Sequence, residues 1–175
     1  MKAEYIGDKN NFAIRYVCDF TQNDDKYKFA YCHLVLRGQI IGDKNELCYL
    51  NSWRIRLQNI KEQIKNNFDS ISHAEFENRT DKELFELIFK ANQLEEEYNI
   101  DYDYLPKLES KIWSSCHISI DETTDDYLIT MTGYNDKIKF LWKINDELYS
   151  IIAERNYVIE ILEKALEIIE RDYYL

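Results

Sequence analysis

The sequence predicts an α+β fold: a mostly antiparallel sheet, made of an N-terminal meander and a late hairpin, with central helices and a long C-terminal amphipathic helix. Three observations support this class. Apolar residues recur at every second position in the first 50 residues, which is the period of a strand. Helical spacing takes over in the middle of the chain and returns at its end. The 175 residues, 45% of them hydrophobic, suit a single α+β domain over residues 1–175.

Strands are expected first. One face of the first strand carries only apolar residues, namely Phe12, Ile14, Tyr16, Cys18 and Phe20. Residues 27–36 are apolar on both faces, as in a central strand. The polar residues 21–26 between them predict a hairpin loop, and residues 46–50 a further short strand. The pentapeptide Ile-Gly-Asp-Lys-Asn occurs twice, at residues 6–10 and 41–45, and each copy predicts a Gly-Asp turn that leads into a strand.

Two central helices follow. The first is predicted from a cap at Ser52 to about Phe68, because apolar residues recur there at helical spacing. The second begins at a capping box, in which the side chains of Thr80 and Glu83 each satisfy a free backbone N–H group. Its buried face is expected to contain Leu84, Leu87, Ile88 and Ala91.

The last part of the chain predicts three strands and one helix. Alternating apolar residues indicate strands over residues 116–121, 127–133 and 137–143, and Asn135-Asp136 belongs to a hairpin turn. Residues 146–171 keep helical spacing and predict a single helix of roughly 40 Å at 1.5 Å per residue. Such a helix either lies across the whole sheet or passes its edge and meets a partner chain.

Composition narrows the function. Acidic residues outnumber basic ones by 33 to 22, which gives a net charge of −11. This balance disfavours nucleic acid and anionic membranes as partners, because both attract positive surfaces. The N-terminus has no apolar signal core and no segment reaches the ~18 apolar residues of a membrane span. We therefore expect a soluble, cytoplasmic protein without a membrane partner.

The search for catalytic motifs argues against an enzyme. No nucleotide-binding, zinc-protease, nucleophile-elbow or calcium-loop motif occurs. Cys32-His33 and Cys116-His117 contain zinc-ligand residue types, but neighbours on a strand point to opposite faces, so no metal site is expected. The four cysteines have no CxxC spacing and are expected to be reduced and buried. Paired carboxylates are interpreted as solvated charge, and no cofactor is expected.

The acidic segment, residues 95–126, is the most informative feature. It has ten acidic and two basic residues, and so holds −8 of the total charge of −11. Tyrosines and a tryptophan interleave with the acids, and these aromatic residues often anchor protein interfaces while clustered charge steers a partner of opposite sign. The alternative is a solvated acidic loop with locally packed tyrosines. The candidate partner-binding residues are Glu95, Glu96, Glu97, Tyr98, Asp101, Tyr102, Asp103, Tyr104, Trp113, Asp121, Glu122, Asp125 and Asp126.

The opening residues resemble a known family. Ile6-Gly7-Asp8 followed by Phe12-Ala13-Ile14, and the later Ile41-Gly42-Asp43 with Leu50, are similar to the immunity protein 42 family of bacterial polymorphic toxin systems. The resemblance covers mostly residues 5–50, and the order of elements agrees to about residue 143. It implies an intracellular antidote that binds a cognate toxin domain stoichiometrically and is not an enzyme.

Three hypotheses follow. The first is an immunity protein that binds a basic toxin domain through the acidic segment. The second is a regulatory or scaffold module that forms a homodimer through its C-terminal helix. The third is a hydrolase that uses an unrecognised carboxylate cluster with a divalent metal. Both the resemblance and the absence of catalytic motifs favour the first.

Overall fold

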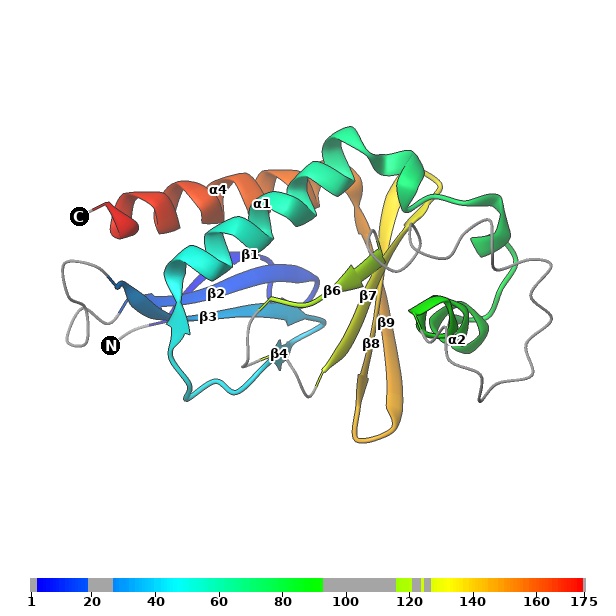
Figure 1. Cartoon of the computed structure of the whole chain (residues 1–175), viewed down its shortest axis with the longest axis horizontal. Coiled ribbons are helices and arrows are strands. Elements are labelled where there is room, and N and C mark those ends of the chain that lie inside the picture. The colour runs from blue at the N-terminus through cyan, green and yellow to red at the C-terminus, as the bar shows by residue number, and fades with distance from the viewer. Residues whose placement is uncertain (1–2, 19–26, 93–115, 121–123, 125–126, 175) are drawn as a thin grey trace.

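Figure 1 shows the computed structural model of the chain, which describes residues 3–18, 27–92, 116–120, 124 and 127–174. The structure contains two antiparallel sheets together with helices, which confirms the predicted α+β class. The elements are β1 (Glu4–Gly7), β2 (Phe12–Cys18), β3 (Phe29–Leu36), β4 (Gln39–Ile41), β5 (Cys48–Tyr49), α1 (Leu50–Asn66), the 3-10 helices η2 (Phe68–Ser70) and η3 (Ala74–Phe76), α2 (Asp81–Asn92), β6 (His117–Ile118), β7 (Leu128–Tyr134), β8 (Lys137–Ile144), β9 (Glu147–Glu154) and α4 (Arg155–Tyr173).

The first sheet is the predicted N-terminal meander. Its strands lie in the order β1-β2-β3-β4, and β5 pairs with β3. The register places Ile14 opposite Ile6 on one side and Leu34 on the other, so the three side chains share a face. Helices α1 and α4 lie side by side along this sheet (Figure 1). Their packing buries the shared face completely at Ile14.

The first helix begins earlier than predicted. Helix α1 starts at Leu50, after Tyr49, and no side chain caps its N-terminus, so the expected cap at Ser52 is wrong. Leu50 and Trp53 are both fully buried and extend the apolar stripe towards the N-terminus. Burial of this stripe therefore determines where the helix begins. Because the helix begins at Leu50, the strand expected over residues 46–50 is limited to the two residues of β5.

The repeated pentapeptide forms two similar turns, as predicted. Gly7 and Gly42 have φ angles of 108° and 104°, a conformation that favours glycine. In each copy the aspartate side chain accepts a hydrogen bond from the backbone two residues on: Asp8 from Asn10 and Asp43 from Asn45, both at 2.9 Å. The repeat is therefore a local turn signal rather than a repeated structural unit.

The second sheet corrects the prediction for the C-terminal region. Its strands lie in the order β6-β7-β8-β9, and β9 occupies residues expected to be the first turns of one long helix. Asn145 and Asp146 both have positive φ angles, 47° and 68°, which makes a two-residue hairpin turn of the kind also formed by Asn135 and Asp136. The strand was missed because its apolar residues lie on both faces and satisfy helical spacing as well.

Other strand boundaries also differ from the prediction. The strand expected over residues 116–121 is limited to His117–Ile118 in β6, which pairs with β7 at only two positions. The strand expected over residues 27–36 begins at Phe29, and the two late strands each end one residue later than predicted. Strand β6 ends where its pairing with β7 ends. An alternation of apolar and polar residues indicates an extended chain, but it does not show which of those residues pair with a neighbouring strand.

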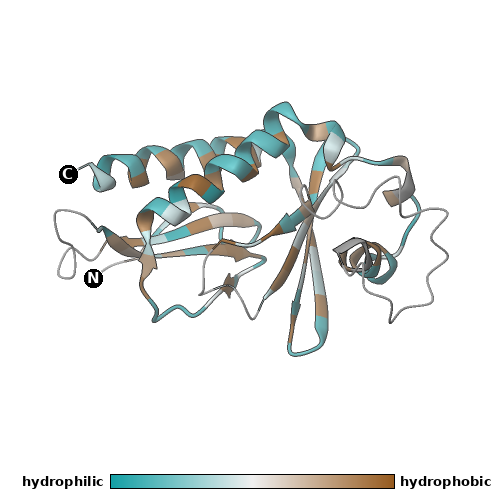
Figure 2. Ribbon diagram, in the orientation of Figure 1, coloured by the Kyte–Doolittle hydropathy of each residue, from teal (hydrophilic) through white to brown (hydrophobic). Residues whose placement is uncertain are grey.

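Helix α4 therefore has 19 residues, and its apolar stripe is buried within the chain. Val158, Leu162, Ala165 and Ile169 are all fully buried. Figure 2 shows hydrophobic and hydrophilic residues alternating round α1 and α4, as expected for amphipathic helices packed on a sheet. The hypothesis of self-association through this helix rested on a 40 Å helix that extends beyond the sheet, and this support is lost.

Contacts join the two sheets into one hydrophobic core. The rings of Phe12 in β2 and Phe140 in β8 stack with centroids 5.1 Å apart. The indole N–H of Trp142 donates a hydrogen bond of 2.7 Å to the side chain of Gln39 in β4. A contiguous cluster of buried residues includes both sheets and their helices. These contacts support the single-domain interpretation.

Helix α2 packs on the face of the second sheet that points away from the first sheet (Figure 1), and its N-terminus is capped. The capping box is confirmed: Thr80 N–H donates to the Glu83 carboxylate at 2.8 Å and Glu83 N–H donates to the Thr80 hydroxyl at 3.3 Å. The next residue, Asp81, accepts hydrogen bonds from Lys139 Nζ at 2.6 Å and Ser150 Oγ at 2.5 Å. Asp81 therefore ties the helix to β8 and β9.

This contact predicts a pH dependence. Burial of Asp81 opposes its ionisation, but the hydrogen bonds from Lys139 and Ser150 outweigh burial and lower its pKa. Because the pKa of Asp81 is lower in the folded chain than in the unfolded chain, its carboxylate stabilises the fold. This stabilisation is complete above about pH 4 and is lost as pH falls through the folded pKa. We expect Asp81→Asn to lower the free energy of unfolding by about 1 kcal/mol at pH 7, a value reduced to allow for the partial solvent exposure of Asp81. The loss should be smaller at pH 3.

Urea unfolding at pH 7 and pH 3 checks this expectation. The matched control is Asp69→Asn, which changes an exposed carboxylate that has no ion pair with any described residue. An equal loss of stability for Asp81→Asn at both pH values would contradict the role given to its charge.

Candidate interaction surfaces

All thirteen predicted partner-binding residues lie outside the described residues. The described residues within the acidic segment, 116–120 and 124, are well anchored. Cys116 is fully buried before β6, and Thr124 is almost fully buried. The Thr124 hydroxyl accepts a hydrogen bond of 3.3 Å from the backbone N–H of Ile120. The acidic segment thus follows α2 in sequence and contains residues that are fixed beside the second sheet.

Charge is distributed unevenly along the chain. The acidic segment holds −8 of the net charge of −11. Among the described residues, acidic and basic side chains are almost equal in number, and many form ion pairs. A partner attracted by the charge of this protein would therefore be attracted mainly to the acidic segment.

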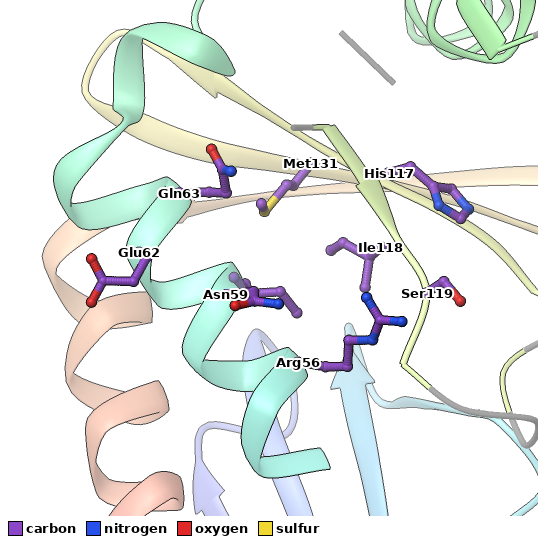
Figure 3. A pocket seen from close by; sticks show the side chains of 9 residues that line it. Arg56, Asn59, Glu62, Gln63, His117, Ile118, Ser119 and Met131 are labelled. Atoms are coloured by element: carbon purple, nitrogen blue, oxygen red, sulfur yellow. The ribbon is translucent and has the colours of Figure 1, made fainter. Parts of the chain in front are cut away.

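An open groove of about 220 Å³ lies between α1 and β6, beside the anchors of the acidic segment. Figure 3 shows Arg56, Asn59 and Gln63 of α1 on one side of it and Ile118 near Met131 on the other. Most of its lining side chains are polar and can form hydrogen bonds, and Ile60, Ile118 and Met131 add apolar contacts. His117 also lines the groove, and its ring points away from α1 in Figure 3. Burial lowers the pKa of this side chain.

The Cys-His dipeptides do not form metal sites within the described part of the chain. His33 is fully buried, and its Nδ1 lies 3.0 Å from the guanidinium of Arg15 while its Nε2 lies 2.9 Å from the backbone oxygen of Asp43. Arg15 can only donate, so Nδ1 accepts and the ring is neutral with its proton on Nε2. No group of three metal-ligating side chains is found among the described residues.

The cysteines have a structural environment. Cys32, Cys48 and Cys116 are buried and Cys18 is half-buried, and none forms a disulfide. Burial raises the pKa of the Cys116 thiol to about 12. A thiol in this state is not a nucleophile at neutral pH.

A cluster of tyrosines was not foreseen from the sequence. Tyr27 and Tyr49 contact each other edge to face with centroids 5.9 Å apart, and Tyr173 and Tyr174 do so at 5.1 Å. The Arg54 guanidinium lies over the Tyr173 ring at 5.9 Å. Burial and a hydrogen bond with Tyr173 raise the pKa of Tyr49. This hydrogen bond joins the two tyrosine pairs. Three segments distant in the sequence supply these rings, so only the fold brings them together.

Within the described residues, no helix is both long enough and apolar enough to cross a bilayer.

Comparisons with known proteins give a consistent result. The family model described as immunity protein 42 matches residues 1–168. A solved structure of CdiI from Burkholderia dolosa AUO158 is similar in fold, with a TM-score of 0.66 and 13% sequence identity, and the match covers 94% of this chain and 99% of that one. The curated proteins contain no significant match.

Proposed function

The chain belongs to the immunity protein 42 family, and from this premise we propose that it neutralises its cognate toxin by direct stoichiometric binding through the acidic segment, without catalysing a reaction. The observation that carries this proposal is the concentration of charge. Most of the net charge lies in one segment rich in tyrosine, while the described residues are nearly balanced. A basic toxin domain is the partner that such a segment attracts.

The anchors of the acidic segment support this role. The segment follows α2, which Asp81 ties to β8 and β9, and it contains the buried residues Cys116 and Thr124. The described residues within the segment are therefore held against the second sheet. An interface near a rigid scaffold loses less conformational entropy on binding than one at a free terminus.

Toxin inhibition by occupation of a surface requires no catalytic group in the inhibitor. The buried thiol of Cys116 and the neutral, hydrogen-bonded ring of His33 have structural roles. The side chains of the groove beside β6 can donate and accept hydrogen bonds, which suits contact with a protein partner. Binding alone is thus the activity that these side chains support.

Charge reversal in the acidic segment tests the proposal. We expect the double substitution Asp101→Lys and Asp103→Lys to weaken toxin binding about 10- to 100-fold, mainly through a slower association rate. The affinity of the parent chain should fall as salt rises, and the variant should show a weaker salt dependence. Tyr102→Ala with Tyr104→Ala should also weaken binding, mainly through faster dissociation. Surface plasmon resonance with the purified cognate toxin domain measures both rates.

A matched control separates the segment from total charge. Glu77→Lys with Glu167→Lys changes the net charge by the same amount, at exposed residues without an ion pair to any described residue. This control should bind within about 3-fold of the parent chain, because the exchanged charges lie away from the interface. If both double variants weaken binding equally, or neither does, the acidic segment is not the interface.

A further inference from the structure

The outer edge of β9 is the longest strand edge left open in the described part of the structure. Strand β9 ends the order β6-β7-β8-β9 and pairs with β8 along all eight of its residues. The other edge strands are short: β1 has four residues, β4 three, and β5 and β6 two each. Short edges protect a sheet against pairing with other chains, and β9 lacks this protection.

The hairpin turn determines which backbone groups face outward. A two-residue turn at Asn145-Asp146 makes Ile144 and Glu147 a hydrogen-bonded pair. Hydrogen-bonded and non-hydrogen-bonded pairs alternate along an antiparallel ladder. The N–H and C=O groups of Leu148, Ser150 and Ile152 therefore point away from β8. No backbone group of another described element bonds to them.

The side chains on β9 do not protect the edge either. The strand has no lysine, arginine or proline, and its register with β8 is continuous, without a bulge. Four of its eight residues are half-buried, and Ile152 is 43% exposed. The exposed carboxylates of Glu147 and Glu154 lie at its two ends. Glu154 forms an ion pair of 2.7 Å with Lys137 of β8, whereas Glu147 accepts a hydrogen bond from the Tyr149 hydroxyl and has no ion pair with a described residue.

We propose that an extended segment of the toxin pairs with β9 and adds a strand to the second sheet, an inference that rests on the proposed function. The backbone edge supplies the hydrogen bonds, and apolar side chains of the incoming strand cover Ile152. Glu147, which has no ion pair with a described residue, favours a strand with a basic residue opposite it.

Charge argues against a second copy of this chain as the occupant. Antiparallel pairing of two β9 strands in symmetric register would place Glu147 of one opposite Glu154 of the other. Lys143 pairs with Asp146 and Lys137 with Glu154 within each copy, so a second copy offers Glu147 an acidic neighbour and no basic residue of its own β9. A basic toxin meets no such repulsion. Helix α2 leads into the acidic segment and contacts β9 through Asp81 and Ser150, so both surfaces belong to the same part of the molecule.

Proline at position 152 tests the edge. Ile152→Pro removes one outward N–H group and keeps the hydrogen bonds to β8, because the lost donor faces solvent. We expect it to weaken binding of the purified toxin domain about 10- to 50-fold. Ile152→Val keeps the N–H group and the branched shape, and should bind within about 3-fold of the parent. Circular dichroism and thermal unfolding verify that each variant is folded.

Hydrogen exchange gives a second measurement that does not depend on a variant. In the free chain the amides of Leu148, Ser150 and Ile152 should exchange fast, and binding should slow them. Their neighbours Tyr149, Ile151 and Ala153 bond to β8 and should exchange slowly in both states.

The outcomes separate the two proposals. If the parent chain inhibits the toxin but folded Ile152→Pro binds equally well, or the outward amides stay fast in the complex, the edge proposal is overturned and the proposed function stands. If these amides are already slow in the free chain and it is dimeric, a second copy occupies the edge and the proposal is wrong. If the parent chain does not bind the toxin, both fail.

Discussion

Substitution of Gly7 by alanine is expected to lower the free energy of unfolding by about 3 kcal/mol, through backbone strain of about 1 kcal/mol and steric overlap of a further 1–3 kcal/mol. Gly7 has a φ angle of 108°, and a Cβ atom there would lie 2.6 Å from the backbone oxygen of Phe12. The hydroxyl of Tyr157 crosses the same turn: it accepts from Asp8 N–H at 2.5 Å and donates to the Phe12 carbonyl at 3.0 Å. The turn therefore cannot move away from α4 without breaking these bonds.

Gly38 provides the matched control for this prediction. Its φ angle of 80° is also positive, but no atom lies within 4 Å of a Cβ built there. Gly38→Ala should therefore cost only the backbone strain, about 1 kcal/mol. Urea unfolding of both variants measures the difference. Equal destabilisation would show that the close approach of Tyr157 and Phe12 to Gly7 has no energetic consequence.

Arg155→Ala is expected to destabilise the chain by a similar amount, about 3 kcal/mol. Arg155 is the first residue of α4, and it donates to two carbonyls at the end of α1, Ile64 at 3.0 Å and Lys65 at 3.1 Å. It also pairs with Asp136 in the β7–β8 turn at 3.0 Å and lies over the Phe68 ring at 4.1 Å. One guanidinium thus satisfies a helix C-terminus and joins three elements.

Two further variants define the origin of this effect. Arg155→Lys should recover only about 1 kcal/mol, because an ammonium cannot make the same fork of hydrogen bonds to two carbonyls and a carboxylate. Lys164→Ala, which breaks an exposed ion pair with Glu160 on the same helix, should leave the midpoint of urea unfolding almost unchanged. If Arg155→Lys is as stable as the parent chain, charge alone explains the contact and the fork geometry does not matter.

Local sequence signals predicted the elements that short-range chemistry determines. The Thr80–Glu83 capping box, the Ile-Gly-Asp-Lys-Asn turns and the alternation in β2 all appear as expected, because each depends on residues that are neighbours in sequence. The resemblance in residues 5–50 to the immunity protein 42 family also agrees with the family match over residues 1–168.

Features that depend on tertiary contacts were predicted less well. Strand β9 was assigned to a helix because Leu148, Ile151 and Ile152 fit a period of 3.6, although Asn145-Asp146 repeats the dipeptide of the preceding hairpin turn. That repeated dipeptide was the signal that could have identified the strand. The tyrosine cluster and the three-way contact of Arg155 left no comparable signal, since their members come from distant segments. The thirteen predicted interface residues remain a prediction, because they lie outside the described residues.

Titration of toxin activity with this chain tests the central claim most directly. The purified cognate toxin domain is held at a concentration well above the dissociation constant, and its residual activity is measured as the chain is added. Stoichiometric neutralisation predicts a linear fall that reaches zero at one equivalent, with an endpoint that does not change on longer incubation. Activity that persists at several equivalents would contradict neutralisation by binding. Complete inhibition at far less than one equivalent, increasing with time, would contradict a binding mechanism and indicate that the chain acts as a catalyst.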